Sequence, residues 1–269
     1  MIPVVEAVSV SKTYPRRAGV LRRQVGAVQA VDGVSLALQT GERLGLVGES
    51  GCGKTTLAKL LVGLLAPSAG AVRIQGRPLD ALQGQTLLAA RAVVQFIFQD
   101  PMNSLNPRMT VEQIVSEPLV IHRIGENSQR RQRAEALLDT VQLPGSHLNR
   151  LPRQLSGGER QRVGIARALA LDPKALICDE PIASLDISIG AQILELLRRL
   201  SVERGMSLLF ISHDLRAVAS LCQRISVMQA GRIVETAPTD QLLSAPADPY
   251  TRLLLRSADL DLDAAPSAS

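Results

Sequence analysis

The sequence predicts an α/β fold in which a mostly parallel sheet is covered by helices on both faces. Short apolar segments alternate with amphipathic ones along most of the chain, which is typical of parallel strands joined by helices. A glycine-rich loop also separates one predicted strand from a predicted helix. The 269 residues are 46% hydrophobic, which is enough for one large domain with a lobe.

The first part of the chain carries most of the predicted strands. Apolar runs predict strands at residues 4–10, 34–38, 43–47, 71–74 and 93–98, and helical spacing predicts a helix at residues 55–65. Turns are expected at Thr40-Gly41 and Gln75-Gly76. The stretch 16–26 is basic and contains glycine, so we expect an exposed loop there.

The second part begins with a helical lobe and then returns to alternating elements. From residue 103 to residue 153 strand character is lost, and helical runs such as 129–141 predict a lobe inserted into the core. Further on, we expect helices at 160–170 and 189–203, strands at 175–178 and 207–211, and a hairpin turning at Ala230-Gly231. After residue 257 the chain is rich in Ala, Asp and Ser, and we expect a frayed tail.

Composition limits which cellular compartment and which classes of partner we expect. The net charge of +5 permits anionic partners, but no long basic tract occurs, so nucleic acid is not expected. Cys52, Cys178 and Cys222 form no CxxC pair, which favours a reducing compartment. Neither a signal peptide nor an apolar run of membrane-spanning length is present. We therefore expect a soluble cytoplasmic chain, unless a partner holds it at a membrane.

A phosphate-binding loop is the first specific motif. The residues Gly48, Glu49, Ser50, Gly51, Cys52, Gly53, Lys54 and Thr55 fit the pattern G-x-x-x-x-G-K-[ST] between a strand and a helix. Glycines let backbone N–H groups turn toward phosphate oxygens, and the helix N-terminus adds its positive dipole. Lys54 can reach the β- and γ-phosphates, and the Thr55 hydroxyl can ligate Mg²⁺.

Two further strand ends carry candidate catalytic groups. The apolar run 176–178 ends in Asp179 and Glu180. Such an aspartate can hold Mg²⁺, and the glutamate after it can polarise an attacking water. The run 208–211 ends in Ser212, His213 and Asp214, so His213 can contact the γ-phosphate or that water.

One octapeptide makes the prediction specific. Leu155, Ser156, Gly157, Gly158, Glu159, Arg160, Gln161 and Arg162 closely resemble the signature of ABC ATPases, usually written LSGGQ, with Glu159 in place of the commonest Gln. The resemblance to ABC transporter ATP-binding subunits covers about residues 4–256. It implies a P-loop NTPase (RecA-like) core, an N-terminal antiparallel β subdomain, and an ABC α-helical subdomain inserted at about 103–158.

The resemblance also implies roles for individual residues. Two subunits pair head to tail around two ATP molecules, and Ser156, Gly157, Gly158 and Glu159 complete the site of the partner. Tyr14 stacks on adenine, and Thr56 adds to the phosphate loop. Gln99 senses Mg²⁺ and links to the membrane subunit. The D-loop Ser184-Leu185-Asp186 crosses the dimer interface, and His213 is the switch histidine.

The function implied is that of the ATP-hydrolysing subunit of an ABC importer on the cytoplasmic face of the inner membrane. Its partners would be two permease subunits, a second ATPase subunit and, indirectly, a periplasmic or extracellular solute-binding protein. One alternative is a soluble ABC ATPase in translation or DNA repair. Those usually carry two cassettes or a long coiled-coil insertion. Another alternative is a binding module that uses ATP only as a structural clamp. Such a module would have lost the acid pair or the switch histidine, whereas Glu180 and His213 are both present.

Two segments narrow the branch of the family. Residues 98–107 and 248–254 resemble the peptide, opine and nickel uptake branch, which leaves di- or oligopeptides and nickel or a metal chelate as solutes. No cysteine follows Cys222, so an iron–sulfur site is not expected after it. The compact end and the segments 221–224 and 231–236 look more like nickel-uptake ATPases. On sequence alone, nickel or a related chelate is slightly favoured over peptides.

Overall fold

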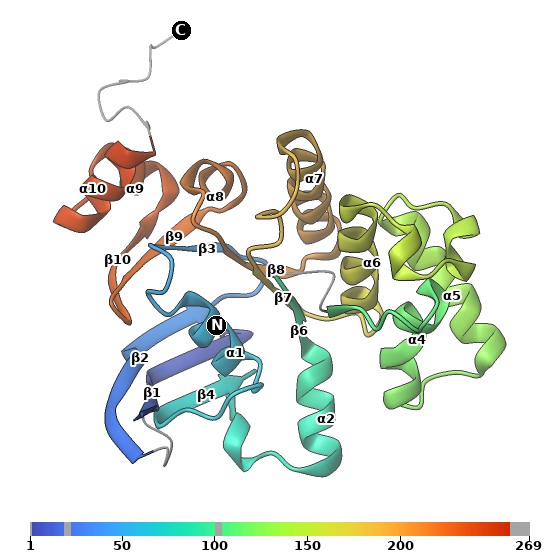
Figure 1. The fold of residues 1–269 in the computed structure, drawn as a ribbon, viewed down its shortest axis with the longest axis horizontal. Helices are drawn as coiled ribbons and strands as arrows, with labels where there is room; N and C mark the ends of the chain where they lie inside the picture. Colours follow the sequence, from blue (N-terminus) through green and yellow to red (C-terminus); the bar gives the residue numbers. More distant parts are fainter. Residues whose placement is uncertain (1, 19–22, 100–103, 259–269) are drawn as a thin grey trace, which may run out of the picture. The chain divides into compact units, whose positions relative to one another are not determined.

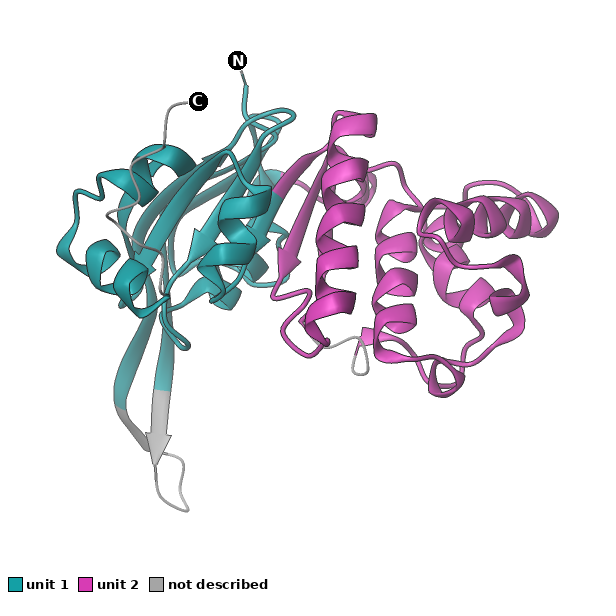
Figure 2. Cartoon of the chain, turned by 90° about the horizontal axis from the view of Figure 1, so that it is seen from above, with its two compact units in different colours: residues 1–81, 209–269 teal, residues 82–208 magenta. Residues whose placement is uncertain are grey.

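The computed structural model describes residues 2–18, 23–99 and 104–258. They belong to two compact units (Figure 2). The first unit contains residues up to 81 and from 209 onward, and the second contains residues 82–208. The expected frayed tail falls almost wholly on residues 259–269, which lie outside the described part of the chain.

An antiparallel sheet forms the N-terminal part of the first unit (Figure 1). Its strands, in the order β2-β1-β4-β5, are β1 (Val5–Ala18), β2 (Arg23–Leu38), β4 (Ala69–Ile74) and β5 (Arg77–Pro78). Apolar residues of β1, β2 and β4 form its buried side, among them Val10, Val31 and Val72. The predicted antiparallel β subdomain is thereby confirmed.

The prediction of a loop at residues 16–26 is wrong. The backbone of β1 and β2 stays paired far beyond the apolar residues, with Arg16 opposite Gly26 and Ala18 opposite Arg23. The described part of this hairpin extends away from the rest of its unit (Figure 2). Pairing uses backbone N–H and C=O groups, so a basic sequence can continue a hairpin that apolar residues begin. Residues 19–22, within the expected loop, lie outside the described residues.

A second set of strands runs in the order β10-β9-β3-β8 and lies in the first unit, apart from the first two residues of β8. These are β3 (Arg43–Val47), β8 (Ser207–Ile211), β9 (Arg224–Gln229) and β10 (Arg232–Pro238). β3 and β9 are parallel, whereas β9 and β10 form the predicted antiparallel hairpin. The predicted bounds of β3 and β8 are confirmed to the residue, because only small or apolar residues follow Arg43 in β3 and Ser207 in β8.

The helices of the first unit are α1 (Lys54–Leu61), α8 (Leu215–Leu221), α9 (Thr239–Ser244) and α10 (Pro249–Ser257), with the 3₁₀ turn η1 (Leu79–Ala81). α8 packs closely on β3: a Cβ added to Gly45 would lie 2.2 Å from Cγ1 of Val218. Glycine at this position therefore lets the helix approach the strand. The sequence did not predict α8, α9 or α10.

The second unit combines two parallel strands with a group of helices. β6 (Val94–Ile97) pairs with β7 (Ala175–Asp179) in parallel. The helices are α2 (Gly84–Val93), α4 (Val111–Ile121), α5 (Asn127–Thr140), α6 (Gly157–Leu169) and α7 (Ile187–Arg204), with the 3₁₀ turns η2 (Gly145–Asn149) and η3 (Pro152–Gln154). α4, α5 and α6 contact one another through buried residues such as Ile114, Leu138 and Ile165. The α/β class and the helical character after residue 103 are confirmed.

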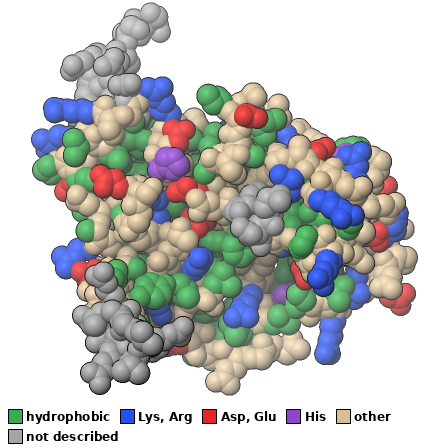
Figure 3. Space-filling model, viewed as in Figure 1, with side chains coloured by type: hydrophobic (Ala, Val, Ile, Leu, Met, Phe, Trp, Pro, Cys, Tyr) green, Lys and Arg blue, Asp and Glu red, His purple; other side chains and the backbone are tan. Residues whose placement is uncertain are grey.

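None of the described helices has both the length and the apolar character that crossing a membrane requires. On the face drawn in Figure 3, acidic and basic side chains are interspersed. The net positive charge is thus not gathered in one place on that face.

Candidate active site

The loop between β3 and α1 has the backbone that the phosphate motif requires. Gly48 and Gly53 have φ angles of 152° and 113°, which side chains rarely adopt. Space is also lacking: a Cβ on Gly48 would lie 2.1 Å from the carbonyl O of Met228, and one on Gly53 would lie 2.1 Å from that of Ala30. Both positions therefore need glycine, and the loop is held between β9 and β2.

Lys54 lies inside this loop. Its Nζ donates to the carbonyl oxygens of Gly48 at 2.7 Å and Glu49 at 2.9 Å, and the residue is only 4% exposed. An ammonium held by neutral carbonyls gains much more from a phosphate oxygen, because a charged acceptor makes the stronger hydrogen bond. Thr55 and Thr56 follow in the first turn of α1, both half-buried.

His213 lies in the same unit, next to the strand that leads into the loop. It follows the end of β8, and the N–H of Ser212 donates to the carbonyl O of Leu46 on β3 at 3.2 Å. The next residue, Asp214, caps α8 by accepting the N–H of Arg216 at 2.9 Å. The exposed His213 is thus fixed between a strand end and a helix cap.

Tyr14, the predicted adenine platform, lies on β1 in the first unit. The residue is 38% exposed, so part of it is accessible. Lys12 Nζ lies 5.6 Å from the ring centroid, within the range of a cation–π contact.

In the second unit, Gln99 and Glu180 meet. Ile97 of β6 is opposite Cys178 of the parallel strand β7. The segments that follow the two strands therefore begin at the same edge of the sheet. Nε2 of Gln99 then donates to Oε2 of Glu180 at 3.1 Å. Asp179, the last residue of β7, is 2% exposed. Glu180 has a φ of 45°, an unfavourable value for a residue with a side chain, and such strain concentrates at functional sites.

The signature segment begins α6. Ser156 is the N-cap, its hydroxyl accepting the N–H of Glu159 at 3.3 Å. A Cβ on Gly158 would lie 2.6 Å from Cγ2 of Ile189 on α7, so glycine lets the two helices approach closely. Ser156 itself is exposed, which leaves the N-terminus of α6 accessible.

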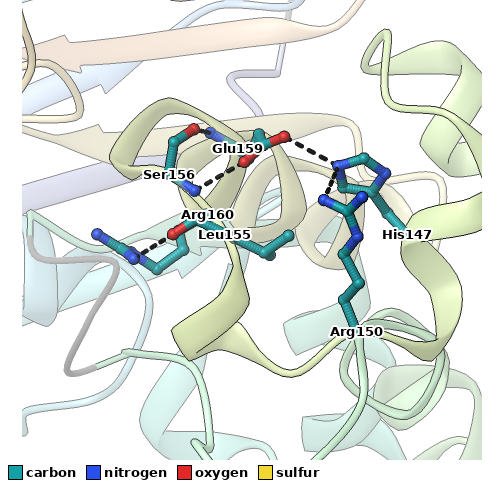
Figure 4. A network of polar contacts seen from close by, with 6 residues as sticks. All are labelled: His147, Arg150, Leu155, Ser156, Glu159 and Arg160. Carbon is teal, nitrogen blue, oxygen red and sulfur yellow. Dashed lines mark hydrogen bonds and ion pairs between the residues drawn. The ribbon is translucent and has the colours of Figure 1, made fainter.

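Glu159 has a defined structural role at the position where the family usually has glutamine (Figure 4). Its Oε2 accepts the N–H of Ser156 at 2.7 Å, which completes a capping box. Its Oε1 lies 2.9 Å from Nε2 of His147, and Nη1 of Arg150 lies 3.1 Å from the same ring nitrogen. The Ser156 N–H and, second, His147 lower the pKa of Glu159 from 4.5 to about 2.

A pH dependence of stability follows from this carboxylate. Because its folded pKa is lowered, its stabilisation is present above pH 4.5 and is lost as the pH falls toward 2. With partial exposure taken into account, we expect Glu159→Gln to lower the free energy of unfolding by about 1–2 kcal/mol at pH 5 and by about half as much at pH 3. Urea unfolding at both pH values measures this. The exposed Glu203→Gln is the control, and an equal loss at both pH values would contradict the role of the charge.

Comparison with known proteins decides the family. Residues 31–183 match the family model described as ABC transporter. The chain belongs to the ABC transporter family. This membership makes it an ABC-type ATPase that binds and hydrolyses ATP.

Relatives and solved structures agree with this membership. The chain is 46% identical to a probable peptide ABC transporter ATP-binding protein, y4tS, of Sinorhizobium fredii over 93% of this chain and 71% of the relative. It is 47% identical to the oligopeptide transport ATP-binding protein OppF of Bacillus subtilis over 87% and 78%. A dimeric, post-hydrolysis structure of the ATP-binding cassette MJ0796 with ADP and Pi superimposes with a TM-score of 0.77, at 31% identity, over 87% of this chain and 98% of that one.

The predicted ABC site residues divide between the units. The first unit holds Tyr14, His213 and the phosphate loop 48–56, and the second holds Gln99, the acid pair 179–180 and the signature 156–159. Sequence reasoning missed two side chains that contact these residues, His147 and Tyr250, and it also missed Arg150, which contacts His147. His147 and Arg150 lie shortly before the signature, but their spacing matches no motif.

Proposed function

We propose that this chain is the ATP-hydrolysing subunit of an importer for di- or oligopeptides, working with two separate permease subunits. The observation that carries the proposal is the similarity to the y4tS and OppF proteins, named for peptide and oligopeptide transport, at 46% and 47% identity over most of the chain. The segments 221–224 and 231–236 resemble nickel-uptake ATPases, which makes nickel or a metal chelate the second candidate solute.

The chemistry proposed is in-line attack of water on the γ-phosphate of ATP. Amides of the phosphate loop other than that of Glu49, which donates to Tyr250, bind the phosphates together with the ammonium of Lys54, and Tyr14 stacks on adenine. Glu180 orients or deprotonates the water. Its hydrogen bond with Gln99, at 3.1 Å, supports this role because it restricts the carboxylate to one orientation. His213 contacts the γ-phosphate.

The three predicted Mg²⁺ ligands, one in the first unit and two in the second, all carry oxygen donors. Thr55 offers a hydroxyl, Asp179 a carboxylate that is 2% exposed, and Gln99 an amide oxygen, and hard oxygen donors of this kind are those that Mg²⁺ prefers. We propose that these three residues hold it, directly or through water. The ion, when bound, neutralises charge on the β- and γ-phosphates.

A head-to-tail pair completes the proposed site. The exposed Ser156 and the N-terminus of α6 would bind the γ-phosphate held by the partner's phosphate loop. Solved structures of the cassette MJ0796, described as dimeric, support such a pair. We propose that ATP-driven closing is transmitted to the permeases through Gln99 and the helical subdomain at about 103–158. The chain would then lie peripherally on the cytoplasmic face of the inner membrane, and a solute-binding protein would deliver the solute from outside.

Uptake measurements in a deletion strain test the solute. We expect the strain to resist a toxic dipeptide or tripeptide and to accumulate labelled peptide several-fold more slowly, with normal nickel content. The wild-type gene should restore uptake, and a Lys54→Ala gene should not. Lower nickel content with normal peptide uptake would show that the importer carries nickel and not peptides. Normal uptake of both would favour a soluble ATPase outside transport.

A further inference from the structure

Tyr250 lies in the segment 248–254, which resembles the peptide, opine and nickel uptake branch. Its side chain contacts the phosphate loop. The Tyr250 hydroxyl accepts a hydrogen bond from the backbone N–H of Glu49 at 3.1 Å, across 201 positions of sequence. Tyr250 is 8% exposed, so water competes weakly for this bond. Burial raises the pKa of Tyr250, so the hydroxyl stays neutral.

The backbone that leads into Tyr250 is held by hydrogen bonds. Asp248 caps α10 by accepting the N–H of Tyr250 at 2.8 Å, and Pro249 occupies the first turn. Glu235 of β10 accepts the N–H groups of Ala247 at 2.8 Å and Asp248 at 3.0 Å. The hydroxyl is therefore presented to the loop from a rigid support.

The bond acts on the peptide group that also holds Lys54. The N–H of Glu49 and the C=O of Gly48 belong to one planar peptide and point in opposite directions. Tyr250 accepts from the N–H, while the carbonyl accepts from Nζ of Lys54 at 2.7 Å. The orientation of this plane thus sets where the ammonium is held before a nucleotide arrives.

We propose that Tyr250 is a positioning residue for ATP binding, whose hydroxyl holds the Gly48–Glu49 peptide plane and so preorganises the phosphate loop and Lys54. The proposal rests on the phosphate role proposed for this loop. Without the hydroxyl the plane can rotate, and the loop must be ordered when ATP binds, which weakens affinity. The Pro-Tyr-Thr helix thereby gains a direct link to nucleotide binding.

The variant Tyr250→Phe removes one hydroxyl and keeps the ring. We expect its dissociation constant for ATP to rise about three- to tenfold, the effect of one lost hydrogen bond, while kcat at saturating ATP stays within about twofold. Equilibrium titration with a fluorescent ATP analogue and steady-state kinetics measure the two. Without nucleotide, amide hydrogen exchange in a peptide covering residues 48–53 should become faster.

Ser257→Ala is the matched control, since it removes a hydroxyl from an exposed position of the same helix, where Oγ donates to the carbonyl O of Leu254 at 2.8 Å. We expect it to leave ATP affinity and loop exchange unchanged. The same loss of affinity in both variants, or wild-type affinity and exchange in Tyr250→Phe, would overturn the proposal. Lys54→Ala tests the phosphate-binding role of the loop separately. If this variant binds ATP normally, the loop does not have that role.

Discussion

Replacing Glu180 with glutamine is expected to lower ATP hydrolysis about 10³-fold while ATP binding persists. The amide keeps the shape of the side chain, and it can keep a hydrogen bond with Gln99, now 3.1 Å from Oε2 of Glu180. It cannot take a proton from the attacking water, so the step that reopens the proposed dimer is blocked. Phosphate release measures hydrolysis, and light scattering with ATP should show a persistent dimer.

Two further variants serve as a control and a comparison for Glu180→Gln. Glu203→Gln makes the same chemical change at an exposed position of α7 and should hydrolyse ATP at the wild-type rate. Lys54→Ala should lose both binding and hydrolysis, because it removes the ammonium buried in the phosphate loop. Equal loss of ATP binding in Glu180→Gln and Lys54→Ala would contradict the separate roles proposed for these residues.

The elements predicted best from the sequence are the buried strands. β3 and β8 are buried on both faces apart from half-buried Arg43, so every other position in them is apolar or small. The helix α2 was missed for the opposite reason. None of its residues is buried, so it has no apolar stripe to give a helical period.

The site was predictable where chemistry is local in sequence. The phosphate loop, the acid pair and the signature each depend on neighbouring residues, so a short pattern specifies each one. Contacts such as Glu49 with Tyr250 join distant residues, and no local pattern marks a tyrosine whose hydroxyl meets one particular amide. The capping role of Glu159 was open to prediction, since Ser156 and Glu159 have the spacing of a capping box.

Mixing two inactive variants tests the proposed head-to-tail site. We expect Ser156→Arg to bind ATP on its own phosphate loop yet to inactivate the site it completes in its partner. Arginine at the exposed Ser156 removes the hydroxyl that caps α6 and blocks the approach to its N-terminus, without touching the core. Lys54→Ala inactivates the other half of the site. Each variant alone should therefore hydrolyse ATP at a background rate.

In a mixed pair, both lesions fall in one site and the other site is intact. A one-to-one mixture forms mixed pairs about half of the time, each with one working site, so up to about a quarter of wild-type hydrolysis should return. The control mixture is Lys54→Ala with Glu180→Gln. If Glu180 serves the phosphate loop of its own chain, these two lesions disable both sites of a mixed pair, and no hydrolysis should return. Recovery in the control mixture but not in the first would mean that Glu180, rather than the signature, is supplied by the partner.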